Sequence, residues 1–229
     1  LAGAAMSADG YHPTAPDPTG RGAVLAVTRA LRVAGLTADD VGYVNGHGTG
    51  TPANDAMERA AFRLIFGDRA SHLPISSTKS QIGHTLGAAG ALEATACVAA
   101  ISEHLLPPTI RVPDDAVTDV DVVARPGRSA DVDVAVSVNY AFGGSNVALV
   151  VRSTDTGRDG ADGGRAGDDS PGRRPSAVPR VVVTGIGAVG SLGLGIDAWG
   201  DALRTGARPI ERRSLGAGIS MLAAPIPPI

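Results

Sequence analysis

The pattern of apolar and polar residues predicts three helices before residue 110, and one of them has a clear helical period. Between Arg21 and Gly35 this period is carried by Val24, Val27, Leu31 and Ala34. Thr51-Pro52 predicts a helix cap followed by proline at the first helical position, with the helix running to about Phe66. A third helix, built largely of small residues, is predicted from Gly87 to about Glu103.

Short apolar runs predict strands between these helices. The predicted strands are Val41–Asn45, Leu73–Ser77, Val132–Asn139 and Asn146–Val151. The last two are joined by a turn with two glycines, which indicates an antiparallel pair. Residues 1–20 are predicted to be loop, because three prolines between His12 and Pro18 exclude a regular helix.

The composition changes abruptly after Arg152. Residues 153–179 are mainly Gly, Asp, Arg, Ser and Pro, so we expect a flexible linker there. Apolar residues return with a predicted buried strand and glycine turn at 180–190 and a short helix at 196–203 that has Trp199 on its apolar side. We therefore expect three parts, 1–152, 153–179 and 180–229, of which the last is too short for a core of its own.

Composition narrows the functional classes. Hydrophobic residues make up 43% of the 229 residues but aromatics only 3%, which favours tight packing of small aliphatic side chains between helices and a sheet. The net charge of −3, without a basic block, argues against nucleic acid as a partner. A single cysteine rules out a disulfide framework within the chain and fits a cytoplasmic protein. We expect no membrane span, and we interpret the N-terminus as an internal cut, not a signal peptide.

Two loops that follow predicted strands carry the candidate chemistry. One holds His47 between glycines, followed by Thr49 and Thr51, whose hydroxyls suit an extended polar ligand. The other holds Lys79 and, five residues later, His84. An imidazole donates a hydrogen bond to a developing oxyanion or moves a proton near neutral pH. Taken singly, the first loop is equally compatible with a glycine-rich turn that has an incidental histidine. The second is equally compatible with a surface lysine and a helix-capping histidine.

Other chemistries have weaker support. No third ligand at a familiar spacing accompanies the two histidines, so we expect no metal. Gly185 to Gly190 fits a dinucleotide pattern, which expects an acidic residue about 20 positions further on. The nearest candidate for it, Glu211, follows a proline-broken stretch, and we therefore expect no nicotinamide cofactor. Cys97 lies in the middle of a predicted helix at an apolar position, where we expect a small buried hydrophobe and not a nucleophile.

Four motifs in order resemble the C-terminal half of β-ketoacyl-ACP synthases, of the elongating type and of type II polyketide systems. They are Tyr11–Pro16, Gly46–Asp55, Ser77–Ala91 and Asn139–Asn146, and the resemblance covers about residues 1–152. It implies a thiolase-like fold of layered α-β-α-β-α architecture, only partly present here. It also implies an acyltransferase that carries out decarboxylative Claisen condensation in fatty acid or polyketide biosynthesis.

The resemblance assigns roles to individual residues. It implies that His47 and His84 stabilise the oxyanion formed from malonyl-ACP and that Lys79 supports them. Thr49, Thr51 and, less directly, Thr14 would contact the phosphopantetheine arm. Phe142 would gate the site and Glu93 would be a buried structural carboxylate. The expected partners are acyl carrier protein and a homodimeric or chain-length-factor-like subunit, with no bound cofactor.

The chain departs from the family pattern at three points. The family's nucleophilic cysteine lies in the N-terminal half, Cys97 does not match it, and so we expect the isolated chain not to condense. Ala141 stands where glycine usually precedes the gating Phe142. From Arg180 to about Ile210 the chain resembles the family's N-terminal strand and first helix, so a second ketosynthase-like unit is expected to begin there. A non-catalytic chain-length-factor-like subunit and a thiolase that uses coenzyme A stay open as alternatives.

Overall fold

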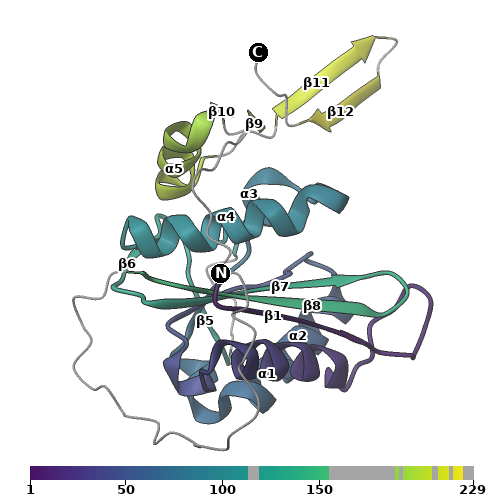
Figure 1. Ribbon diagram of the computed structural model, residues 1–229. Coiled ribbons are helices and arrows are strands. Elements are labelled where there is room, and N and C mark those ends of the chain that lie inside the picture. The colour runs from purple at the N-terminus through teal and green to yellow at the C-terminus, as the bar shows by residue number, and fades with distance from the viewer. Residues whose placement is uncertain (113–118, 155–188, 191–192, 208–210, 217–218, 224–229) are drawn as a thin grey trace, which may run out of the picture.

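A six-stranded mixed sheet organises the computed structural model (Figure 1). The structure describes residues 1–112, 119–154, 189–190, 193–207, 211–216 and 219–223. The strands of the sheet, in spatial order, are β1 (Gly3–Ala8), β8 (Ser145–Arg152), β7 (Val134–Ala141), β2 (Tyr43–Asn45), β3 (Pro74–Ser76) and β5 (Asp121–Val122). The pairs β1–β8 and β8–β7 are antiparallel, whereas the pairs β7–β2, β2–β3 and β3–β5 are parallel.

Helices cover both faces of this sheet and make three layers. α1 (Arg21–Ala34) and α2 (Pro52–Phe66) lie on one face, and α4 (Ala89–Ser102) lies on the other (Figure 1). The buried stripe of α1 repeats at helical spacing and joins the larger hydrophobic core: Gly22, Ala23, Ala26, Val27, Ala30 and Leu31. Small side chains let helix and strand approach closely. A Cβ added at Gly3 of β1 would lie 2.3 Å from the Ala30 carbonyl oxygen.

Shorter elements connect these layers. Among the described residues they are η1 (Ala38–Asp40), η2 (Gly67–Ser71), α3 (Lys79–Ile82), η3 (Leu86–Ala88), β4 (Leu105–Leu106) and β6 (Arg128–Ser129). Further along lie β9 (Val189–Gly190), β10 (Gly193–Leu194), α5 (Gly195–Thr205), β11 (Glu211–Gly216) and β12 (Ile219–Ala223). Leu203 of α5 is buried against Ile82 and Ala96, so α5 packs on the side of α4 that faces away from the sheet. None of the helices in the described ranges is long and apolar enough to span a membrane.

Most elements expected from the pattern are present. The helices at 21–34, 52–66 and 196–203 are confirmed, with Thr51 as the cap and proline in the first turn of α2. The small-residue helix begins two residues later than predicted, after η3. The antiparallel pair is confirmed as β7 and β8, and β7 is shifted two residues toward the C-terminus.

The loop predicted for residues 1–20 is wrong at its start. Gly3–Ala8 forms β1, because its backbone pairs with β8 and its Gly3, Ala5 and Ser7 side packs on α1. The prolines that excluded a helix all come after this strand. Most of the predicted linker and of the strand at 180–190 lies outside the described residues, as does the side chain of Trp199.

Candidate active site

The two chemically active loops meet because their strands are parallel neighbours. β2 and β3 pair in parallel, with Val44 opposite Ile75, so their carboxyl ends lie at the same edge of the sheet. His47 comes two residues after β2 and Lys79 three residues after β3. A hydrogen bond from the Gly46 N–H to the Ser76 carbonyl, 2.8 Å long, continues the pairing to the point where the loops diverge.

A buried trio of side chains forms where these loops face α4. The Lys79 Nζ lies 3.2 Å from the Nδ1 of His47 and also forms an ion pair with Glu93. His47 and Lys79 are each 6% exposed and Glu93 is fully buried. Glu93 points toward Lys79 because it lies on the buried side of α4. The buried positions of this helix are Ala89, Glu93, Ala96, Cys97 and Ala100. A buried ammonium requires such partners, so the carboxylate and the imidazole account for the position of Lys79.

The contacts of the two histidines define which ring nitrogen carries the proton. An ammonium has no acceptor, so Lys79 donates to Nδ1 of His47 and leaves the proton on Nε2. The Leu86 backbone N–H likewise donates to Nδ1 of His84, at 3.1 Å. The two rings lie 5.5 Å apart, nearly perpendicular at 88°. Both neutral rings therefore keep an Nε2–H donor, which is the arrangement that holds a developing oxyanion.

Burial and charge keep these rings neutral. The pKa of His47 is lowered to about 3, first by burial, then by the positive charge of Lys79 and by His84. The pKa of His84, which is exposed, is lowered by partial burial and by Lys79. The pKa of Glu93 is raised by burial, against the opposing charge of Lys79. At neutral pH both histidines are thus hydrogen-bond donors without being cations.

Glu58 is a site residue that the sequence interpretation missed. It lies on the buried stripe of α2, and its carboxylate accepts hydrogen bonds from the backbone N–H groups of His47, at 2.6 Å, and Gly48, at 2.9 Å. Burial raises its pKa to about 7, although both backbone donors, Lys79 and Asn54 favour its charged form. Glu58 therefore anchors the loop that presents His47. In the sequence, the one signal for Glu58 was its position as a glutamate on the apolar face of a predicted helix.

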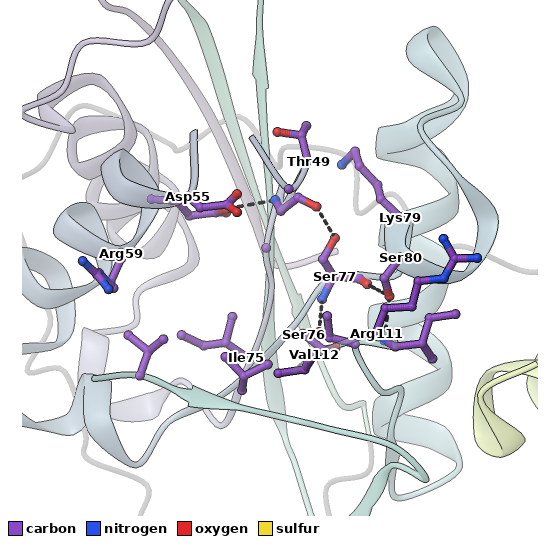
Figure 2. Close-up of a pocket in the computed structure, with 18 of the residues that line it drawn as sticks. Thr49, Asp55, Arg59, Ile75, Ser76, Ser77, Lys79, Ser80, Arg111 and Val112 are labelled. Atoms are coloured by element: carbon purple, nitrogen blue, oxygen red, sulfur yellow. Dashed lines mark hydrogen bonds between the residues drawn. The ribbon is translucent and has the colours of Figure 1, made fainter. Parts of the chain in front are cut away.

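A cavity of about 780 Å³ opens beside the trio (Figure 2). Thr49 and Lys79 lie at one side of it and Ile75 and Val112 at the other, as Figure 2 shows. His84 also lines this space, so the cavity combines polar groups at the end near Lys79 and His84 with an apolar wall. Such a mixed lining suits a ligand with a polar reacting group and a flexible, mostly apolar chain.

The structure does not bring all predicted site residues to this cavity. Thr51 is exposed at the cap of α2, with its hydroxyl 3.2 Å from that of Thr49. Thr14 is exposed in the loop after β1, and Phe142 is 79% exposed at the tip of the β7–β8 hairpin. That tip and that loop are joined by a hydrogen bond from the Gly143 N–H to the Pro13 carbonyl.

Cys97 is packed inside the molecule. It has no exposed surface and lies in a core cluster with Tyr43 and Leu106. Its thiol pKa is raised by burial and by the negative charge of Glu93, which favours the unreactive protonated form. Within the described residues no three His, Cys, Asp or Glu side chains gather as metal ligands would.

Comparison with solved structures identifies the fold as that of thiolase-like ketosynthases. A β-ketoacyl synthase from Burkholderia phymatum superimposes with a TM-score of 0.61 at 38% identity, covering 66% of this chain and 36% of that one. A type II polyketide ketosynthase solved with its acyl-carrier protein and a hexaketide gives a TM-score of 0.64 at 32% identity, covering 68% of this chain and 38% of that one. The ketosynthase ApeO of Xenorhabdus doucetiae, solved with its chain length factor, gives 0.58 at 40% identity, covering 66% and 38%.

Sequence comparison agrees with the structural match. Residues 1–113 match the beta-ketoacyl synthase C-terminal domain. Over 153 residues the chain is 46% identical to 3-oxoacyl-[acyl-carrier-protein] synthase 2 of Synechocystis, covering 66% of this chain and 37% of that protein. Over 150 residues it is 43% identical to the ketoacyl synthase alpha subunit of the tetracenomycin polyketide synthase of Streptomyces glaucescens, covering 65% and 35%. Residues 1–113 are the C-terminal domain of the beta-ketoacyl synthase family, and the wider match corresponds to the C-terminal half of a ketosynthase. It spans little more than a third of the length of these curated relatives.

Proposed function

We propose that residues 1–152 form the oxyanion-holding half of an enzyme that condenses acyl and malonyl thioesters carried on acyl carrier protein. The observation that carries this proposal is the pair of neutral rings, His47 and His84, each with Nδ1 engaged and an Nε2–H left as donor. Loss of carbon dioxide from a malonyl thioester places negative charge on the thioester oxygen. His84 lines the largely apolar cavity, the His47 ring lies 5.5 Å from the His84 ring, and their two N–H donors would stabilise that charge.

Lys79 and Glu93 have supporting roles in this proposal. Lys79 fixes the tautomer of His47 and keeps its pKa low, so that the ring donates a hydrogen bond without carrying a proton away. Glu93 balances the charge of Lys79 in the interior. Thr49, which lines the cavity, and Thr51, whose hydroxyl lies 3.2 Å from that of Thr49, would hydrogen bond to the amides of a pantetheine arm. Thr14 and Phe142 would contact the arm from the hairpin side. A thioester on such an arm needs no further cofactor for this chemistry.

The nucleophile and the partner proteins are also part of the proposal. The acyl group would be held by a cysteine outside this chain, because Cys97 is buried and protonated. We therefore expect the isolated chain not to catalyse condensation. Acyl carrier protein is the proposed substrate carrier, and a second ketosynthase or a chain-length-factor-like subunit is the proposed partner. The connected trio of His47, Lys79 and Glu93 favours a catalytic over a purely structural role for this segment.

A chimeric enzyme tests the proposal directly. Residues 1–152 would replace the corresponding segment of the Synechocystis synthase, which supplies the remaining part of the enzyme. We expect malonyl-ACP decarboxylation in this chimera, and a loss of about 10²–10³-fold with His47→Ala or His84→Ala, as for the removal of an oxyanion donor. Transfer of the acyl group to the enzyme should change little.

The exposed His72 provides the matched control, because His72→Ala removes an imidazole outside the cavity. Decarboxylation should be measured as released carbon dioxide and acylation by mass spectrometry of the intact protein. An active chimera in which His47→Ala and His84→Ala decarboxylate as fast as the parent would refute the oxyanion role.

A further inference from the structure

Asn139 lies on the sheet face that α4 covers, beside the buried trio. It belongs to β7, opposite Val147 of β8, and is half-buried. Its side-chain amide faces Gly90 of α4: a Cβ added at Gly90 would lie 3.4 Å from Nδ2 and 3.9 Å from Oδ1 of Asn139. Gly90 precedes Glu93 by three residues, one turn of the helix, so the amide approaches the carboxylate along the surface of α4.

The carboxylate of Glu93 has one oxygen without a close partner. Its Oε1 is paired with Lys79, whereas Oε2 is buried and, among the residues that the structure describes, has no partner at hydrogen-bond distance. A buried acceptor left unpaired destabilises the folded state, and more so when it is charged, so a nearby donor is favoured. The side-chain NH₂ group of Asn139 is such a donor, because it faces the side of α4 on which Gly90 lies, one turn before Glu93.

The influence of Asn139 on ionisation extends to both ends of the trio. Burial raises the pKa of Glu93, and Lys79 and the Asn139 amide oppose that rise. Burial and Lys79 lower the pKa of His47, and Asn139 opposes that fall. A single carboxamide produces both effects only by accepting from the ring and donating to the carboxylate.

We propose that Asn139 is a positioning residue whose amide joins the ring of His47 to the free oxygen of Glu93. The carbonyl oxygen of the amide accepts from the ring, and its NH₂ group donates to Oε2. With Lys79 bridging the same two groups, the four side chains close into one cycle of polar contacts. Because Lys79 occupies Nδ1, the ring proton that Asn139 accepts is the one on Nε2, and the two contacts together hold the ring in one tautomer.

This role is independent of any reaction, but its catalytic consequence rests on the proposed function. In the ligand-free protein the amide satisfies the Nε2–H, and a thioester oxygen entering the cavity would share or replace this acceptor. An amide is a neutral acceptor, so its hydrogen bond from the ring N–H is weaker than one to a carboxylate. An entering oxyanion therefore replaces the amide as acceptor more readily than it would replace a carboxylate. Asn139 would thus prepare His47 for the substrate without making the ring a base.

The test measures the tautomer of the His47 ring and the exchange of its proton by nitrogen NMR, in the full chain labelled with ¹⁵N-histidine. The His47→Gln variant assigns the signals of this ring. In the unmodified chain we expect one tautomer at neutral pH, protonated on Nε2. Asn139→Leu, similar in size but without polar atoms, should give a mixture of tautomers and exchange of the ring proton with water about tenfold faster. Asn139→Asp keeps an acceptor, so it should retain the tautomer.

The added charge in Asn139→Asp should also raise the pKa of His47 measurably. The other titratable groups around the ring are held constant in this comparison: Lys79 of α3, His84 of the following loop, Glu93 of α4, Glu58 of α2 and Tyr140 of β7. Asn139→Asp also provides the readout if Asn139→Leu does not fold, as judged from backbone amide spectra. An unchanged pKa of His47 in a folded Asn139→Asp chain would contradict the contact.

Val147→Ala is the matched control, because it removes packing directly across the strand pair from Asn139 without touching a polar atom. We expect it to leave the tautomer and the exchange rate of His47 unchanged. The proposal is overturned if Asn139→Leu also leaves them unchanged, or if Val147→Ala disturbs them as much. Neither result depends on decarboxylation, so failure here and failure of the proposed function are distinguishable.

Discussion

At the scale of single residues, the site depends on charged groups held where water does not reach them. Lys79 is the centre, because it contacts the His47 ring and the Glu93 carboxylate at once. Glu58 acts from the opposite side through the backbone of the His47 loop. The low pKa of His47 and the high pKa of Glu58 both have burial as their largest cause, and they act on stability in opposite directions.

Acidification should destabilise the folded chain through His47. Its pKa of about 3 in the folded state lies below the ordinary 6.5, so between these values the unfolded chain binds a proton that the folded chain does not. The contribution is complete above pH 6.5 and is lost as the pH falls toward 3, with a slope of at most about 1.4 kcal/mol per pH unit. The free energy of unfolding in urea, measured over this range, should fall less steeply in His47→Gln than in the unmodified chain.

Glu58→Gln gives the opposite trend and serves as the matched control. The pKa of Glu58 is raised from 4.5 to about 7, so its contribution to stability is present at low pH and is lost as the pH rises through 7. The difference in unfolding free energy between the unmodified chain and Glu58→Gln should therefore shrink with rising pH. Parallel stability curves for the chain and both variants would show that neither group is perturbed as the structure indicates.

At the scale of elements, the parallel pair β2 and β3 brings the two loops together. Their close approach depends on Gly48, which has φ of +42° and would place a Cβ 2.4 Å from the Cβ of Ser77. The same loop contains Gly50, with φ of +75° and open space around its Cβ position. Both glycines have a left-handed backbone. A side chain at Gly48 would clash with Ser77, whereas a side chain at Gly50 would meet no neighbour.

Gly48→Ala should therefore be more damaging than Gly50→Ala. The left-handed backbone alone costs roughly 1–2 kcal/mol in each variant. At Gly48 the clash with Ser77 adds to this, and it forces the His47 loop away from the Lys79 loop. Urea unfolding of both variants measures the difference, and ¹⁵N spectra of His47 report whether the ring has left Lys79. Equal losses of stability would exclude the close approach of the loops as a constraint.

At the scale of the whole molecule, the packing of α4 on the sheet encloses Cys97, so that only unfolding exposes it. α4 covers the sheet at this point, and Cys97 has no exposed surface. Modification of Cys97 by a thiol reagent should thus slow as the free energy of unfolding of the chain increases, and it should be fast only in denaturant. Ser102→Cys, at the exposed end of the same helix, is the control and should react at once. Rapid stoichiometric labelling of Cys97 in the native chain, or its acylation by malonyl thioesters, would contradict this arrangement.

Much of this architecture could be predicted from the sequence, and the failures have physical causes. The stripes of α1 and α2 follow the helical period closely, because each helix buries one side on the sheet. β1 was missed because only three of its residues face α1 and their side chains are small, so its pattern is weak. β5 has two residues and owes its existence to pairing with β3, a contact distant in sequence.

The candidate site shows the same division. His47, Lys79 and His84 could be singled out because each combines a titratable group with a strand-ending, glycine-rich or polar loop. Glu58 and Asn139 were not. The position of Glu58 on the apolar face of a predicted helix was its one local signal, and an asparagine in a strand has none. Glu58 matters because it accepts hydrogen bonds from the backbone of the His47 loop. Asn139 matters because its amide faces α4.

By itself the sequence determined the helices, the core strands and the chemical types at the site, because periodicity and side-chain chemistry are local properties of the chain. Tertiary structure alone decided that β2 and β3 are parallel neighbours, which brings Lys79 to within 3.2 Å of His47. It also decided that α4 brings Glu93 to the same ammonium and that Cys97 is buried between α4 and the sheet. Distances between groups far apart in sequence, and the burial that shifts their pKa values, exist only once the layers have packed.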